Sequence, residues 1–183
     1  MIPTSQKKPE EIIMNIRKLK NIIIVAVLSS VCVLSQTTIA AGSLAVSKEV
    51  SINAAPDTVW KMIGGFNDFD MWHPVVVNLE SEGEGMKSGD VRVLVLGNGA
   101  KITEKLVVHS DSKKTYTYSI TESPLPVMDY VSTITVSEAD SGMSIVEWKS
   151  TFNANNASDE KAIETMAGVY DAGLNNIVKH FNQ

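Results

Sequence analysis

The chain has 183 residues, of which 44% are hydrophobic and 20% are charged, and its formal net charge is −5. This length suits one domain with an appendage rather than two full domains, and the apolar fraction is that of a globular protein, not of a disordered one. Beyond residue 40 the chain carries 11 basic and 19 acidic side chains, a formal charge of −8. Nucleic-acid binding uses clustered lysine and arginine side chains, so this composition argues against a DNA or RNA partner.

The amino terminus has the pattern of an export signal. A basic cluster around Lys18 precedes an apolar stretch, residues 22–34, and small residues follow up to Ala40. This is the order of a secretory signal peptide, and the apolar stretch is shorter than the roughly 20 residues that a membrane-spanning helix needs. We therefore predict a signal peptide over residues 1–40, cleaved after Ala40, with no stable membrane anchor afterwards and a periplasmic or secreted mature protein. Met14, just before the basic cluster, is a second candidate for the true start.

The only cysteine of the sequence, Cys32, lies in the apolar stretch, so the mature chain would contain no cysteine and form no disulfide. Lipoprotein processing at Cys32 is the alternative, but Ser29 and Val31 fit poorly where such sites usually have leucine and a small residue. A domain of about 140 residues can rely on its hydrophobic core, because it buries roughly two thirds of its unfolded surface.

The mature chain begins with one strand and two short helical segments. Hydrophobic side chains alternate over residues 44–53, which is typical of a half-buried strand. Pro56 suits the first position of a helix, and Gly64 ends that helix. A second helical turn is expected over residues 67–71, directly before Trp72-His73-Pro74.

Six further strands are expected, separated by short turns rich in glycine, proline, asparagine and aspartate. They cover residues 75–82, 91–96, 101–110, 115–122, 128–139 and 144–153. Such short connections make neighbouring strands antiparallel, because a parallel return needs a crossover of a dozen or more residues.

The carboxy terminus has the period of a long helix. After Ser158, a suitable N-cap, apolar side chains recur every three or four positions. The stripe comprises Ile163, Met166, Tyr170, Leu174, Ile177 and Phe181. A curved antiparallel sheet of about seven strands, wrapped around this helix, would bury the stripe and the inner strand faces together, so we predict one α+β domain over residues 41–183.

Five segments resemble the START-like, or SRPBCC, superfamily, which includes the polyketide cyclase/dehydrase group. They are INAAPDTVW at 52–60, FNDFDMWHP at 66–74, the ITEKL and YTYSI strands, and PLPVMDY at 124–130. The resemblance spans the mature chain and is closest to the exported MxaD-like subgroup, whose best-known relatives are associated with periplasmic methanol oxidation. It implies a helix-grip fold with a ligand cavity between sheet and long helix, but no particular reaction, because a fold does not determine a function.

Trp72 and His73 are the first candidate site residues. In folds of this kind they lie at the mouth of the cavity, where Trp72 could stack on an apolar ligand and His73 could bind the ligand or act as a base. In the alternative interpretation, Trp72 closes the end of the core and His73 hydrogen-bonds a loop carbonyl. The histidines do not have the spacing of metal ligands, so no metal site is expected.

Glu104 is the second candidate catalytic residue. It shares one side of its strand with Ile102 and Leu106, so a carboxylate lies in register with the apolar face. Buried without a partner, its pKa would rise, which is how acid/base residues arise. The alternative is that a bulge shifts the register and Glu104 pairs with Lys101 or another lysine at the surface.

Aromatic and hydroxyl side chains complete the candidate ligand site. Walls of this kind suit a small apolar molecule, although ordinary core packing is the alternative for each residue. The set comprises Tyr116, Tyr118, Tyr130, Ser132 and Tyr170. The sequence has no phosphate-binding loop, dinucleotide fingerprint or nucleophile elbow, so no cofactor is expected.

Three functions are compatible with this pattern. We favour an exported protein that binds a hydrophobic small molecule in an internal cavity. The second is a cyclase- or dehydrase-like enzyme in which Glu104 or His73 moves a proton on a carbonyl-bearing ligand. The third is an accessory protein whose partner is a periplasmic redox enzyme.

Overall fold

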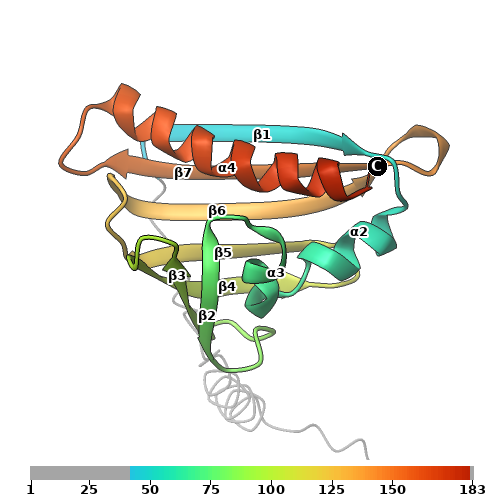
Figure 1. The fold of residues 1–183 in the computed structure, drawn as a ribbon, viewed down its shortest axis with the longest axis horizontal. Helices are drawn as coiled ribbons and strands as arrows, with labels where there is room; N and C mark the ends of the chain where they lie inside the picture. The colour runs from blue at the N-terminus through green and yellow to red at the C-terminus, as the bar shows by residue number, and fades with distance from the viewer. Residues whose placement is uncertain (1–41, 182–183) are drawn as a thin grey trace, which may run out of the picture. The chain divides into compact units, whose positions relative to one another are not determined.

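The computed structural model of the protein describes residues 42–181 (Figure 1). The predicted signal peptide at residues 1–40, its cleavage site and the alternative start at Met14 lie outside the described residues. Within the described part, no helix has both the length and the apolar character that crossing a membrane requires.

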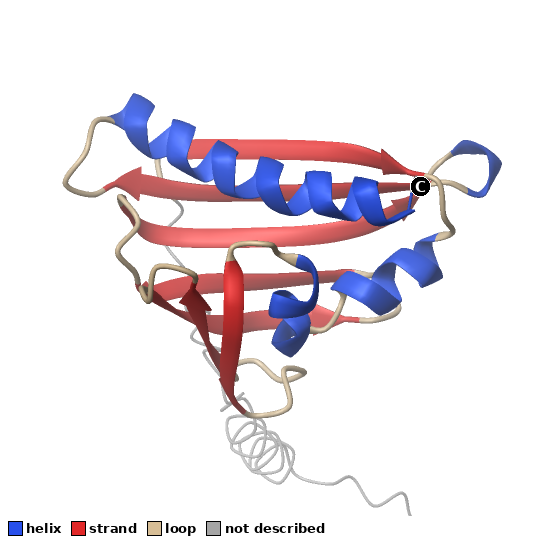
Figure 2. Ribbon diagram, in the orientation of Figure 1, coloured by secondary structure: helices blue, strands red, loops and turns tan. Residues whose placement is uncertain are grey.

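A seven-stranded antiparallel sheet forms the body of the domain (Figure 2). The strands are β1 (Leu44–Ile52), β2 (Val76–Glu82), β3 (Val91–Leu96), β4 (Lys101–Ser110), β5 (Thr115–Glu122), β6 (Val127–Glu138) and β7 (Ser144–Ala154). Their order in the sheet is β1-β7-β6-β5-β4-β3-β2. Each predicted strand is present with its ends shifted by about one residue at most, because alternating hydrophobicity and turn residues are local signals.

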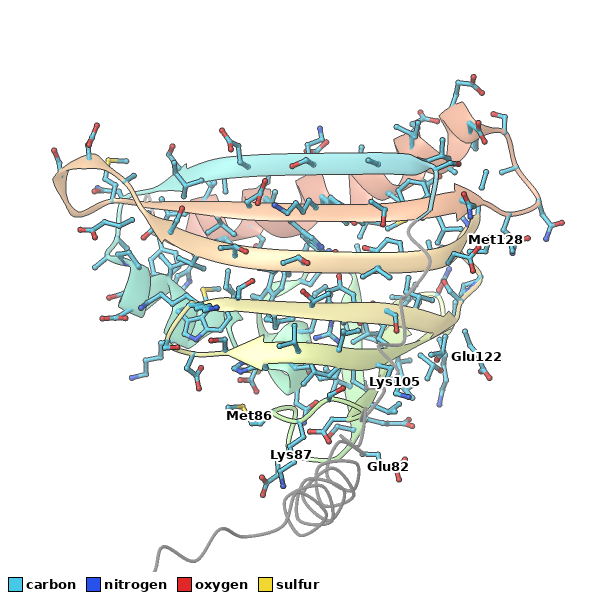
Figure 3. The ribbon with its side chains drawn as sticks, turned by 180° about the vertical axis from the view of Figure 1, so that it is seen from behind. Glu82, Met86, Lys87, Lys105, Glu122 and Met128 are labelled. Atoms are coloured by element: carbon cyan, nitrogen blue, oxygen red, sulfur yellow. The ribbon has the colours of Figure 1, made fainter. Side chains whose placement is uncertain are left out.

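The two faces of the sheet differ in polarity. Along β4, Glu104 and Leu106 are buried whereas Lys105, between them, is exposed. Figure 3 shows the sheet from behind, with Lys105 and Glu122 among the charged side chains on this side. The outer face is therefore in contact with solvent, and the inner face carries the core.

Helices α2, α3 and α4 lie on the inner face of the sheet (Figure 1). The helical segments are α2 (Pro56–Ile63), the 3₁₀ turn η1 (Phe66–Asp68), α3 (Phe69–Trp72), the 3₁₀ turn η2 (Asp140–Gly142) and α4 (Asp159–Phe181). Helix α4 packs against β1 and β7. The backbone N–H of Lys161 donates to Oγ of Ser158 at 3.3 Å, so Ser158 is the N-cap that the sequence predicts. The predicted α+β helix-grip fold is confirmed.

The buried face of α4 differs from the predicted stripe at its first residue. Ile163 is 37% exposed, and Ala162 is fully buried in its place. Successive residues of a helix turn by about 100°, so Ala162 points closer than Ile163 to the direction of Met166, the next buried residue. The buried face comprises Ala162, Met166, Tyr170, Gly173, Leu174 and Ile177, and Phe181 is partly buried.

Gly173 marks a close approach of α4 to the aromatic core. A Cβ atom at this position would lie 2.7 Å from Cδ2 of His73 and 3.0 Å from ring carbons of Trp72 and Trp148. We expect Gly173→Ala to lower the free energy of unfolding by about 1 to 3 kcal/mol, because the packed rings must shift to admit the methyl group. Urea denaturation measures the change.

Gly168→Ala, on the same helix, is the matched control. No atom lies within 4 Å of a Cβ at Gly168, so this variant is expected to be more stable by roughly 1 kcal/mol, the helix preference of alanine over glycine. Equal changes at the two positions would contradict the close packing of α4 on the three rings.

Candidate functional site

A small cavity lies between the sheet, α3 and α4. Its volume is about 50 Å³, and its wall is mostly apolar, with side chains such as Leu94, Ile102 and Met166. The polar residues of the wall are His73, Glu104, Tyr118 and Tyr130. Four of the eight predicted site residues therefore line the cavity.

The other four predicted residues are buried but do not line this cavity. They are Trp72, Tyr116, Ser132 and Tyr170. Nε1 of Trp148, a wall residue, donates to Oγ of Ser132 at 2.9 Å, and the ring of Tyr170 stacks on that of Trp148 with centroids 4.3 Å apart. Ser132 and Tyr170 therefore support the wall rather than form it.

Trp72 belongs to the core beside the cavity. Its ring packs against Phe69 and Trp148 with centroids 4.5 Å and 5.6 Å away. Nδ2 of Asn176, in α4, donates to the backbone carbonyl of Trp72 at 2.9 Å. The expected stacking of Trp72 on a ligand is therefore not supported by its position, because its ring is 1% exposed and is covered by other aromatic rings.

The hydroxyl groups of Tyr118, Tyr130 and Tyr170 bond within the protein. Those of Tyr130 and Tyr170 are 2.5 Å apart, and the hydroxyl of Tyr118 accepts a hydrogen bond from Nε1 of Trp148 at 3.2 Å. Burial raises the pKa of Tyr116 and of Tyr170 to about 12. These phenols therefore stay neutral near neutral pH.

His73 directly follows α3 and is buried against α4. Its Nε2 donates to the carbonyl of Val169 at 3.1 Å, and its ring stacks on Phe69 with centroids 4.9 Å apart. Burial lowers the pKa of His73 from its ordinary value of 6.5 to about 4, although the bond to Val169 opposes the shift. The imidazole is therefore neutral near neutral pH. The alternative interpretation expected His73 to bond a loop carbonyl, but the carbonyl of Val169 belongs to helix α4.

Glu104 is buried, as its register predicts, but it has a partner that the sequence pattern does not predict. Its Oε2 accepts a hydrogen bond from Nε of Arg92 at 2.6 Å, and the two side chains are 5% and 0% exposed. An unpaired buried acid and a surface pair with Lys101 are therefore both wrong; Lys101 pairs with Glu80 instead. Burial raises the pKa of Glu104, and the Arg92 charge opposes the rise.

Arg92 lies on β3, directly opposite Glu104 on β4. Its guanidinium is 4.1 Å from the ring centroid of Phe66 and 4.3 Å from that of Phe69, and it donates to the backbone carbonyl of Phe66. Such faces attract a cation. The available sequence signal was the shared inward side of Arg92 and Leu94 in a period-two strand.

The cavity wall offers a ligand few polar groups. Across residues 42–181, no three His, Cys, Asp or Glu side chains are grouped so that they could hold a metal ion. The cavity wall contains no lysine or arginine, the usual partners of phosphate and carboxylate groups. The wall is therefore suited to a mostly apolar molecule that makes a few hydrogen bonds.

Two wall residues of the cavity lie in connections rather than in helices or strands. Val75, just before β2, lines the cavity and is 44% exposed. Leu125, between β5 and β6, also lines it and is partly buried. The wall therefore includes apolar side chains that are in contact with solvent.

A known protein family matches the chain over most of its length. A family model described as polyketide cyclase / dehydrase and lipid transport matches residues 43–182. The comparison with curated proteins gave no significant match.

Several solved structures share the fold. The protein XoxI from Bacillus cereus is 37% identical, with a TM-score of 0.71, over 76% of this chain and 96% of its own. An uncharacterised protein from Bacillus thuringiensis is 36% identical, also with a TM-score of 0.71, over 76% of this chain and 100% of its own. A protein from Nitrosospira multiformis is 26% identical, with a TM-score of 0.67, over 75% of this chain and 96% of its own.

Proposed function

The chain belongs to the polyketide cyclase/dehydrase and lipid transport family, which is of the SRPBCC type, and we propose that it is an exported protein that binds a small hydrophobic molecule between its sheet and α4. The observation that carries the proposal is the cavity, whose wall is apolar apart from a few buried polar groups such as His73 and Glu104. Burial of apolar surface supplies affinity in such a cavity, and the few polar groups orient the ligand.

The size of the cavity implies that binding widens it. A volume of about 50 Å³ holds only a few water molecules, whereas pockets for drug-sized ligands measure roughly 300 to 1,000 Å³. Val75 and Leu125 are the wall residues that can move most readily, because both lie in connections and neither is fully buried. We expect a ligand to displace them outward.

Native mass spectrometry of the protein, purified from the exported fraction of its own cells, tests the proposal. We expect a small molecule that is released on denaturation and a chain whose mass begins at Ala41. Val169→Phe adds bulk to the wall while keeping the backbone carbonyl that His73 contacts. This variant should lose most of the bound molecule, because the added ring occupies the cavity.

Val178→Phe is the matched control for the binding experiment. Val178 is a partly buried residue of the same helix and does not line the cavity, so its replacement should leave the bound molecule in place. An empty wild-type protein, or equal occupancy in the two variants, would contradict ligand binding at this cavity. A chain that keeps its amino-terminal segment would contradict only the export part of the proposal and not ligand binding.

An enzymatic role for His73 or Glu104 has less support. A general base is most effective when its pKa lies near the working pH, and the pKa of His73 is lowered to about 4. Glu104 is held by Arg92 in a buried ion pair. Neither residue is thus set up to exchange a proton with a ligand near neutral pH.

The kinship with MxaD-like proteins, and with it an accessory role at a periplasmic redox enzyme, stays a prediction. In that role the protein would bind a partner protein, and the cavity would be vestigial and bind no ligand. The same mass spectra distinguish the two roles. A bound small molecule without a protein partner favours the carrier, whereas an empty cavity with a stoichiometric protein partner favours the accessory role.

A further inference from the structure

His73 carries an unused hydrogen-bond acceptor. A carbonyl can only accept, so the bond from Nε2 to the carbonyl of Val169 places the ring proton on Nε2 and leaves a lone pair on Nδ1. Nδ1 is buried and has no hydrogen-bond partner among the described residues. A buried acceptor without a partner costs free energy, so a donor on a ligand would remove a cost that the empty protein bears.

The orientation of the imidazole directs Nδ1 away from α4 at Gly173. The Cδ2 edge of the ring faces Gly173, where a Cβ would lie 2.7 Å away. The opposite edge of an imidazole is its Nδ1–Cε1 bond. His73 belongs to the cavity wall, as do Met166 and Val169, whereas Gly173 does not, so Nδ1 lies on the ring edge that faces away from Gly173 in a residue that lines the cavity.

The carboxylate of the wall, Glu104, selects for the same chemistry. Glu104 is a hydrogen-bond acceptor when ionised, and its counter-charge, Arg92, is not part of the wall. A ligand carboxylate would therefore find no cation in the wall and would lie near the negative charge of Glu104. A ligand that offers a neutral donor meets two acceptors, Nδ1 of His73 and the Glu104 carboxylate, beside tyrosine hydroxyl groups that can donate or accept.

We infer that the ligand is a neutral hydroxylated molecule, an alcohol or phenol on an apolar skeleton, whose hydroxyl group donates to Nδ1 of His73. This inference rests on the proposed function, because it needs a ligand in the cavity. It makes His73 a residue that determines ligand specificity, and it excludes fatty acids and other anionic lipids as preferred ligands.

Three probes with one skeleton test the ligand class: 2-naphthol, naphthalene and 2-naphthoate. Their dissociation constants for the purified protein near neutral pH are measured by equilibrium dialysis. We expect 2-naphthol to bind about tenfold more tightly than naphthalene, the effect of one hydrogen bond to a buried acceptor. We expect 2-naphthoate to bind more weakly than either.

His73→Phe tests the residue. It keeps a ring that can stack on Phe69 but removes Nδ1. The ratio of the naphthalene to the 2-naphthol dissociation constant should therefore fall to about one, because the hydrogen bond that favours 2-naphthol is lost. Met166→Leu, at another wall position, is the matched control. It should change the affinities of both probes alike and leave their ratio unchanged.

A measurement on the wild-type protein does not depend on the folding of a variant. In nitrogen NMR, the Nδ1 resonance of His73 should move on addition of 2-naphthol and not on addition of naphthalene. Equal binding of 2-naphthol and naphthalene, tighter binding of 2-naphthoate, or an unmoved Nδ1 resonance in the 2-naphthol complex would overturn the hydroxyl assignment while leaving ligand binding intact. Binding of none of the three probes would contradict the proposed function itself, and the assignment with it.

Discussion

Glu104→Leu should lower the free energy of unfolding by about 3 to 5 kcal/mol, because it leaves the Arg92 charge buried without a partner. The guanidinium is fully buried and, unlike a carboxyl, cannot escape the cost by changing its protonation state. Urea denaturation near neutral pH measures the loss. Glu80→Leu is the matched control, because Glu80 pairs with Lys101 where both side chains are more than half exposed, and such pairs contribute little.

The reciprocal variant should behave differently with pH. Arg92→Met leaves Glu104 buried without its cation, and burial raises the pKa of that carboxyl. A raised pKa in the folded state favours the protonated form, so this variant should regain stability as the pH falls toward the ordinary pKa of glutamate and lose it as the pH rises. Glu104→Leu should show no such recovery.

The double variant separates pairing from packing. Arg92→Met combined with Glu104→Leu removes both charges together, so it should cost much less than the sum of the two single changes. Additive effects of the two single variants would contradict a buried ion pair that acts as a unit.

Acid should destabilise the wild-type domain through His73. The folded-state pKa of about 4 lies below the ordinary value of 6.5, so the unfolded chain binds the proton more tightly. The contribution of His73 to the free energy of unfolding is fully present above about pH 6.5. Roughly 3 kcal/mol of it is lost as the pH falls from there to about 4. Unfolding free energies measured in urea across this range, for the wild type and for His73→Phe, isolate the effect.

The quantity to compare is the difference in unfolding free energy between wild type and His73→Phe, because carboxyl groups elsewhere also titrate in acid. Wild type should lose stability relative to His73→Phe as the pH falls. His180→Gln is the control, since His180 is exposed and its replacement leaves the burial of His73 unchanged. Parallel pH curves for wild type and His73→Phe would show that His73 is not buried as a neutral ring.

The cavity wall shows how far inward-facing side chains can be assigned from a pattern. Period-two alternation placed Tyr116, Tyr118 and Tyr130 on the inner face, and all three are buried. Only Tyr118 and Tyr130 reach the cavity. Alternation reports which face of a strand a residue occupies, whereas its distance from the cavity depends on the elements that cross that face.

Three features could be predicted from the amino-acid pattern alone: the strand and helix boundaries, the antiparallel arrangement of connected strands and the inward side of Glu104. These follow from hydrophobic period, capping and turn chemistry, which act over a few residues. The pairing of Glu104 with Arg92, the burial of Trp72 under other rings and the bond from His73 to Val169 could not be predicted in this way. Each of these depends on which atoms the folded chain brings within about 3 Å of one another, and the register of β3 on β4 and the position of α4 over the sheet set that proximity.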